Sequence, residues 1–109
     1  MSENIVLTES TFYILLSLVT PRHGYGIMQE VERMSEGRVR LRAGTLYGAL
    51  NTLCDKRWIR QLVPEPGSRK KEYEITDEGF EVLRRESERL RELVENANAV
   101  LGGTEDGRA

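Results

Sequence analysis

One predicted helix, over residues 45–57, carries small polar side chains of types that bind nucleic acid. Its apolar residues cluster on one face, and the opposite face and its flanks hold Thr45, Tyr47, Gly48, Asn51 and Thr52. An asparagine amide can bond adenine bidentately, and a threonine hydroxyl can contact a base or a phosphate. Glycine leaves room for another surface to come close. Solvated polar surface is the alternative interpretation of Asn51 and Thr52.

Basic residues lie on both sides of this helix. Arg42 precedes it and is placed to hold a phosphate. Three more cations occur together in a turn further along: Arg69, Lys70 and Lys71. Residues 37–71 hold nine Arg and Lys against two acids, a net charge of +7, whereas residues 76–109 hold five against nine, a net charge of −4. Cations that neutralise phosphates make DNA binding steeply salt-dependent; the alternative is a charged loop tip without a ligand.

Two tyrosines are expected to hold the DNA backbone rather than to read its sequence. Tyr25 starts a predicted helix over residues 25–35, and Tyr47 lies near the start of the next one. Their hydroxyls can reach phosphates, which positions a protein on DNA without sequence information. Packing of both rings between the two helices is the alternative.

The elements that would position these side chains form a helix–turn–helix followed by a hairpin. Hydrophobic periodicity and alternation predict three helices and two strands, over residues 8–19, 25–35, 45–57, 58–63 and 69–75. Residues 38–42 alternate basic and apolar side chains, so that Val39 and Leu41 can face inward from a short strand or an extended link. The predicted fold class is mainly α with a small two- or three-stranded β wing. Such a winged helix-turn-helix offers one helix to the major groove.

A final helix is predicted over residues 77–101, capped by Thr76. Its apolar positions alternate at spacings of three and four: Phe80, Leu83, Ser87, Leu90, Val94, Ala97 and Leu101. They form a heptad seam with one weak position, at Ser87. A helix that extends beyond a small core needs a partner, and a second copy of the chain is the simplest one. Residues 1–76 would then bind DNA, residues 77–101 would dimerise, and residues 102–109 would form a flexible tail.

Composition narrows the class of protein. The chain has 109 residues, of which 39% are hydrophobic and 31% charged, and this balance indicates a globular protein. Its one cysteine excludes an internal disulfide and fits a reducing cytoplasm. The first residues do not resemble a signal peptide, and the longest apolar stretch is too short to cross a bilayer.

Catalysis and metal binding have almost no support in the sequence. No Ser/His/Asp set, glycine-rich phosphate loop or pair of carboxylates points to an enzyme. His23 is the only histidine, and no Cys/His cluster has the spacing of metal ligands, so we expect neither a metal nor another cofactor. Cys54 lies at the edge of an apolar helix face, where a buried structural thiol is expected. Redox sensing, the alternative, needs an exposed thiolate.

Three segments together resemble the PadR-like transcriptional regulators. They are HGYGIMQEVE at residues 23–32, AGTLYGALNTL at residues 43–53 and GSRKKEYEITDEGFEVL at residues 67–83. The resemblance covers residues 7–101, and the single terminal helix is similar to that of the compact subfamily. Family members carry tyrosines at the positions of Tyr25 and Tyr47. Where the third helix meets the wing, Arg57 and Trp58 stand in place of the small residue that is expected in the family.

The resemblance implies a homodimeric repressor that binds inverted-repeat operators in double-stranded DNA. Dimerisation would run through the seam of the terminal helix, helped by Phe12 of the first helix. Some members release DNA when a small, often planar aromatic molecule binds at the dimer centre. The side chains that could line such a pocket here are Phe12, Tyr13, Ser87, Leu90 and Val94. Core or dimer packing is the alternative role for them, and a repressor that needs no effector is a further alternative.

A function of another class is also open to this fold. Winged helices serve as protein–protein interaction modules as well, and the acidic heptad helix could recruit a different partner. Arg42, Arg69 and Lys70 distinguish the two functions. Removing their charges should abolish DNA binding but leave the association of an interaction module intact.

Overall fold

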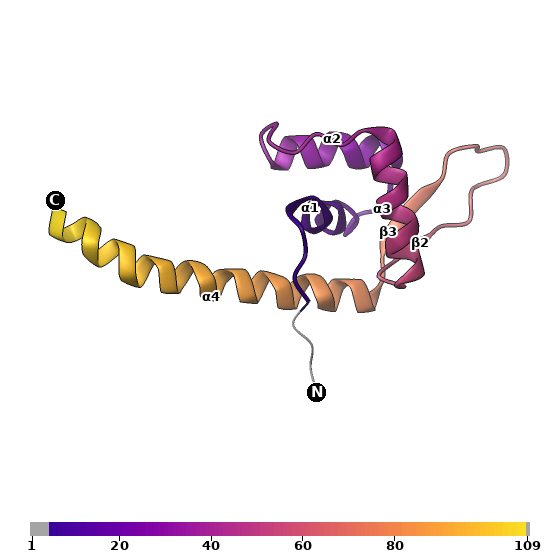
Figure 1. Ribbon diagram of the computed structural model, residues 1–109. Helices are drawn as coiled ribbons and strands as arrows, with labels where there is room; N and C mark the ends of the chain where they lie inside the picture. Colours follow the sequence, from indigo (N-terminus) through magenta and orange to yellow (C-terminus); the bar gives the residue numbers. More distant parts are fainter. Residues whose placement is uncertain (1–4, 109) are drawn as a thin grey trace.

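The computed structural model describes residues 5–108, with side chains through Gly102. In this range the chain forms four helices and a three-stranded antiparallel sheet (Figure 1). The elements in chain order are α1 (Glu9–Ser17), β1 (Arg22–His23), α2 (Gly24–Met34), α3 (Ala43–Asp55), β2 (Ile59–Gln61), β3 (Glu72–Ile75) and α4 (Asp77–Arg108). The fold is mainly helical with a small β wing, as the sequence predicts. Residues 1–4 of the predicted DNA-binding domain and Ala109 of the predicted tail lie outside the described residues.

Three helices build the core because each turns one apolar face inward. α1 begins after Thr8, whose hydroxyl oxygen accepts a hydrogen bond from the Thr11 N–H at 3.1 Å. The helices and their ends contribute side chains that are 3% exposed or less: Ile14, Leu15, Leu18, Ile27, Val31, Leu46, Leu50 and Leu53. The sheet adds Ile59 and Tyr73, and α4 adds Leu83. Burying a side chain of this size contributes roughly 1.5–3 kcal/mol, so this cluster holds α3 in place.

The sheet contains a strand that the sequence pattern does not reveal. β1 has two residues and pairs antiparallel with β3, with Arg22 opposite Tyr73, so that the strand order is β1-β3-β2. Two residues are too few for an alternation to be visible, and the sequence predicts only a connection there. The wing strands are shorter than predicted, and residues 62–71 form the loop between them.

The link between α2 and α3 is extended and forms no strand. At the end of α2, Glu36 adopts a left-handed conformation with φ of 53°, and the Gly37 N–H donates to a carbonyl of the last turn at 2.8 Å. Val39 then donates its N–H to the Ser35 hydroxyl oxygen at 2.9 Å. Val39 and Leu41 pack against the core, as their alternation with arginines predicts.

α4 starts directly after β3 and runs far past the core. Thr76 caps it, because its hydroxyl oxygen accepts a hydrogen bond from the Gly79 N–H at 3.0 Å. A Cβ at Gly79 would lie 2.8 Å from the carbonyl carbon of Trp58, so the first turn of α4 packs closely on the wing. The helix continues to Arg108, past the predicted end at Leu101. Two consecutive glycines weaken a helix by about 1 kcal/mol each, whereas a proline, which would break it, is absent there.

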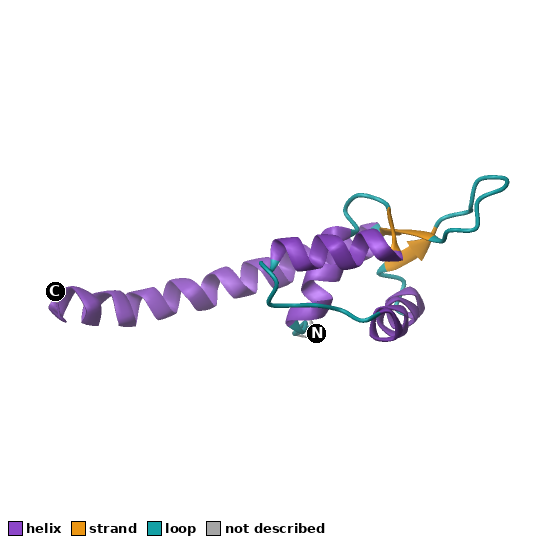
Figure 2. Ribbon diagram, turned by 90° about the horizontal axis from the view of Figure 1, so that it is seen from above, coloured by secondary structure: helices purple, strands orange, loops and turns teal. Residues whose placement is uncertain are grey.

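The molecule is elongated because α4 leaves the body partway along its length. Figure 1 shows α4 passing beneath α1 and continuing away from it, and Figure 2 shows the loop between β2 and β3 at the opposite end. The radius of gyration is 17.0 Å, against about 13 Å for a compact domain of roughly 100 residues. Residues 91–101 are all exposed. Among the described residues, no helix is long and apolar enough to cross a membrane.

Candidate nucleic-acid interface

α3 has a polar outer face opposite a fully buried inner one. Leu46 and Leu50 are 0% exposed. The predicted DNA-contacting residues of the helix are all exposed: Thr45, Tyr47, Gly48, Asn51 and Thr52. A Cβ at Gly48 would meet no atom within 4 Å, so the glycine marks open surface. The Thr52 hydroxyl donates to the Gly48 carbonyl at 3.2 Å, and its oxygen can therefore offer a partner only an acceptor.

Three elements meet in a cleft beside Tyr47. The start of α2, Tyr47 of α3 and the wing loop enclose a volume of about 750 Å³. Five predicted DNA-binding residues line this Tyr47 cleft together: Tyr25, Tyr47, Arg69, Lys70 and Lys71. Hydroxyl groups, cations and the N-terminal N–H groups of a helix all favour an anion such as a phosphate. The structure thus brings together residues that are far apart in the sequence.

The two tyrosines differ in how they are held. Tyr25 is 69% exposed, so it does not pack between α2 and α3. Tyr47 is 42% exposed and lies against the start of α2, with part of its ring accessible from the cleft. His23 connects β1 to the base of the wing, since its Nδ1 lies 3.3 Å from the Lys71 carbonyl oxygen.

The cations of the basic stretch fall into two groups. Three arginines form ion pairs within the chain: Arg38 with Glu9, Arg40 with Glu32 and Arg60 with Glu74, at 2.6, 3.7 and 2.5 Å. Within residues 5–108, no ion pair involves Arg42, Arg69, Lys70 or Lys71. The net charge of the stretch therefore overstates the charge available to a ligand. Lys56 and Arg57 also have no ion pair within residues 5–108, and the Lys56 ammonium lies over the Trp58 ring at 5.1 Å. The four cations predicted to contact phosphates are thus all among the unpaired ones.

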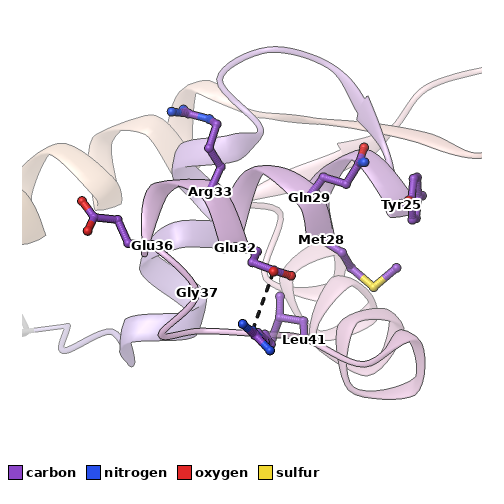
Figure 3. Close-up of a pocket in the computed structure, with 9 residues that line it drawn as sticks. Tyr25, Met28, Gln29, Glu32, Arg33, Glu36, Gly37 and Leu41 are labelled. Atoms are coloured by element: carbon purple, nitrogen blue, oxygen red, sulfur yellow. Dashed lines mark ion pairs between the residues drawn. The ribbon is translucent and has the colours of Figure 1, made fainter.

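A second hollow shares Tyr25 with the first and lies between α2 and the link to α3 (Figure 3). Its lining residues are Tyr25, Met28, Gln29, Glu32, Arg33, Glu36, Gly37, Arg40 and Leu41. Figure 3 shows an ion pair crossing from Glu32 to the link, where Arg40 is its partner. The two acids and two arginines balance. Unlike the Tyr47 cleft, this hollow has no excess charge that would favour a phosphate.

An apolar groove of about 400 Å³ runs between α1 and α4. It is lined by Phe12, Leu16, Val19, Phe80, Leu83, Arg84, Ser87, Glu88 and Arg91. Of the residues predicted to line an effector pocket, Phe12 and Ser87 border this groove, whereas Tyr13, Leu90 and Val94 do not. The groove extends along α4 to Arg91, but the Leu90 and Val94 side chains do not line it.

The residues of the predicted dimer seam differ in exposure, and the first of them, Phe80, is 49% exposed. Leu83 is 5% exposed and packs in the core of the single chain. Leu90 is half-buried, whereas Val94 and Leu101 are 57% and 61% exposed. Ser87 and Ala97 are exposed as well. The exposed seam residues are thus Phe80 and Ser87 at the groove, and Val94, Ala97 and Leu101 beyond the body.

A buried carboxylate that the sequence analysis misses ties α4 to the start of α1. The Glu86 side chain is 1% exposed, and its Oε2 accepts a hydrogen bond from the Leu7 N–H at 3.1 Å. The Arg89 guanidinium donates to both carboxylate oxygens, at 2.7 and 2.8 Å. These bonds, led by that of Arg89, hold the pKa of Glu86 below its ordinary value against the opposing effect of burial. A glutamate within a charged heptad helix gives no sequence signal of this role.

Comparison with known proteins decides the family. The model of the transcriptional regulator PadR-like family matches residues 14–85, which is most of the chain. The chain belongs to the PadR-like family. No curated protein matches at a significant level.

Solved structures share the fold of this PadR-like chain. A PadR family transcription regulator from Clostridium difficile has a TM-score of 0.72 at 23% identity, covering 86% of this chain and 99% of that one. RosR from H. salinarum has a TM-score of 0.64 at 28% identity, covering 90% and 96%. BpsR from Bordetella bronchiseptica has a TM-score of 0.65 at 13% identity, covering 84% and 65%. The PadR-like family consists of transcriptional regulators, not enzymes.

The structure of this PadR-like chain also gives the environments of Trp58, Arg57 and Cys54. Trp58 is 9% exposed and belongs to the core, and Arg57 before it adopts a left-handed conformation. Cys54 is half-buried, and burial raises the pKa of its thiol, which disfavours a reactive thiolate. In the part of the chain that the structure describes, no three His, Cys, Asp or Glu residues come together as metal ligands.

Proposed function

We propose that this PadR-family member is a dimeric repressor that binds an inverted-repeat operator in double-stranded DNA. The observation that carries the proposal is the Tyr47 cleft, where two tyrosines and three wing cations converge beside the exposed face of α3. Hydroxyls and cations are phosphate ligands, and an adjacent helix face with amide and hydroxyl groups suits base edges. Because DNA is the proposed partner, we place the protein in the cytoplasm.

The side chains of this interface divide between reading and holding DNA. Asn51 and Thr45 are proposed to contact base edges, with Thr52 as a further acceptor. The close approach that they need is possible because Gly48 leaves the face open. The proposed phosphate contacts are Tyr25, Tyr47, Arg42, Arg69, Lys70 and Lys71, of which the last three also suit the minor groove. Phosphate contacts supply affinity, and base contacts supply sequence preference.

Dimerisation is proposed to run along the exposed half of α4. Val94 and Leu101, seven residues apart, are 57% and 61% exposed on a helix that extends past the body. Apolar side chains at heptad spacing are covered most readily by a second helix of the same kind. Phe12 of α1 and Phe80, at the groove, would extend the interface. Two-fold symmetry would set the two α3 helices about one turn of DNA apart, roughly 34–36 Å.

A small aromatic effector is proposed for the groove between α1 and α4. Its volume of about 400 Å³ falls within the range of ligand sites. Phe12, Leu16 and Phe80 would cover an aromatic ring, and Arg91 can bond an acidic group on it. DNA binding by the structural neighbour BpsR is regulated by 6-hydroxynicotinic acid. A ligand held between protomers would favour a spacing of the α3 helices that no longer fits two major grooves.

Charge removal tests the proposed DNA contacts. The triple variant Arg42→Gln, Arg69→Gln, Lys70→Gln loses three cations per protomer that have no ion pair among the described residues. We expect it to lose operator binding, and its residual binding to show a log–log salt slope lower by about 5, since each phosphate contact contributes about 0.9. Arg38→Gln is the matched control. Its cation is already paired with Glu9, so the slope should change far less.

The same variants distinguish operator binding from the alternative function, that of a protein–protein interaction module that binds no operator. An interaction module would keep its association when the three charges are removed, and Leu90→Glu on α4 would disrupt it. Operator affinity is measured by fluorescence anisotropy and association by sedimentation. Unchanged DNA affinity in the triple variant would contradict the proposed function.

A further inference from the structure

The ring of Tyr47 lies directly against the first residue of α2. Gly24 is buried there, and a Cβ built on it would lie 2.9 Å from Tyr47 Cζ and closer still to the hydroxyl oxygen. Cβ atoms essentially never approach other atoms this closely. A side chain at position 24 and the observed position of the Tyr47 ring therefore exclude each other. This contact joins the two helices of the helix–turn–helix at the Tyr47 cleft.

Backbone conformation does not explain why this residue is glycine. Gly24 is absent from the glycines with positive φ among the described residues. Within a helix, alanine is favoured over glycine by up to about 1 kcal/mol. The three atoms nearest to a Cβ at Gly24 all belong to Tyr47. By contrast, a Cβ at Gly26 would lie 3.8 Å from Arg22 Cβ, which is an ordinary contact.

We propose that Gly24 is a positioning residue for DNA binding: by lacking a side chain, it lets Tyr47 place its hydroxyl at the Tyr47 cleft. This inference rests on the proposed DNA-binding function. An alanine at Gly24 would meet the far end of a flexible side chain rather than backbone, so the ring would swing aside while the fold persists. The hydroxyl would then leave the place from which it reaches a phosphate.

A double-mutant cycle on DNA affinity tests this role. Gly24→Ala, Tyr47→Ala and the double variant are compared with the wild type on one DNA fragment selected for wild-type binding. We expect Gly24→Ala to weaken binding about tenfold, the effect of losing a modest hydrogen bond in each protomer. In the Tyr47→Ala background it should change nothing further, because no ring remains to be displaced. Gly102→Ala, the same change at a helical glycine of α4 outside the Tyr47 cleft, is the control and should bind like the wild type.

A second variant keeps the test decisive if Gly24→Ala folds poorly. Tyr47→Phe leaves Gly24 and the ring in place and removes only the hydroxyl, so it should weaken binding by a similar factor. Thermal melting followed by circular dichroism checks that all the proteins compared are folded.

Four results would overturn the inference. They are unchanged affinity for Gly24→Ala, the same loss in the Tyr47→Ala background, an equal loss for Gly102→Ala, and unchanged affinity for Tyr47→Phe. If the proposed DNA-binding function is wrong, the result differs from these four, because the wild type itself then selects no DNA fragment.

Discussion

Glu36 and Arg57 adopt a left-handed backbone conformation that glycine usually fills. Their φ angles are 53° and 65°, and they follow the ends of α2 and α3. After α3, Arg57 donates its N–H to the Cys54 carbonyl at 2.9 Å, and Trp58 donates to the Leu53 carbonyl at 3.1 Å. This pair of hydrogen bonds closes the helix end. The backbone bonds fix the conformation, so an arginine is accepted where the family is expected to have a small residue.

Replacing Arg57 by glycine should stabilise the fold. A left-handed residue other than glycine costs roughly 1–2 kcal/mol, and the greater freedom of glycine in the unfolded chain offsets roughly 0.5–1 kcal/mol of that. We expect the free energy of unfolding to rise by about 0.5–1 kcal/mol, as measured by denaturant titration. Lys56→Gly is the control: its φ is −78°, so it should destabilise. A loss of stability in Arg57→Gly would show that the arginine side chain makes a contact that outweighs the strain.

For single residues, the sequence predicts which side chains are exposed but not which charged side chains form ion pairs. The polar face of α3 and the wing cations follow from helical spacing and from a turn signal, both of which are local. The pairing of Arg38 with Glu9 and of Arg60 with Glu74 depends on tertiary structure. The Gly24–Tyr47 contact likewise needs two helices to be placed, and no local pattern contains it.

Among the elements, periodicity predicts α1, α2 and α3 to within two residues at each end. These helices carry an apolar face that must be buried, and that face is visible in the sequence. β1 is missed because its two residues become a strand only by pairing with β3, far along the chain. α4 runs past its predicted end because a long helix continues until a proline or a stable cap stops it.

Glu86 should make the packing of α4 on α1 sensitive to acid. Its folded pKa is below the ordinary 4.5, so its hydrogen bonds stabilise the fold fully above that pH and are lost as the pH falls through the lower, folded value. We expect Glu86→Gln to lower the free energy of unfolding at neutral pH by about 1–3 kcal/mol. The difference in the free energy of unfolding between the wild type and Glu86→Gln should disappear as the pH falls below 4.5, because the wild-type carboxyl becomes neutral as well.

Denaturant titrations across the acid range measure this gap. Glu88→Gln is the control, because Glu88 is exposed and its one ion pair among the described residues is with Arg84 on the same helix. Exposed pairs of this kind contribute about 0–1 kcal/mol. A pH-independent gap for Glu86→Gln would mean that the side chain acts by packing and not by its charge.

In the molecule as a whole, packing within a single chain does not explain the length of α4. The principal extents are 63 × 37 × 20 Å, and the helix accounts for the longest of them. Leu93, Val94 and Leu101 remain exposed on its distal half. The heptad spacing predicts Val94 and Leu101 but not Leu93, and the sequence cannot show where the body of the single chain ends and the exposed seam begins.

A charge on the exposed seam should separate the proposed dimer. Val94→Glu places a carboxylate where a second α4 would pack, and burying an unpaired charge is strongly unfavourable. We expect the sedimentation coefficient to fall to that of a monomer and operator affinity to fall with it. The isolated fold should be unaffected, since Val94 is 57% exposed in the single chain.

The control is Asn96→Glu, which introduces the same charge on the opposite side of the same helix and should leave the dimer intact. A Val94→Glu protein that sediments like the wild type would contradict dimerisation through this seam.

Operator binding by the wild type is the most direct test of the account. The protein is titrated onto a labelled DNA fragment from upstream of its own gene, at two salt concentrations and with excess random competitor DNA. We expect tight binding that resists the competitor and weakens steeply with salt, because several cations neutralise phosphates. Binding that the competitor removes completely, on this fragment and on fragments selected from a random library, would contradict it.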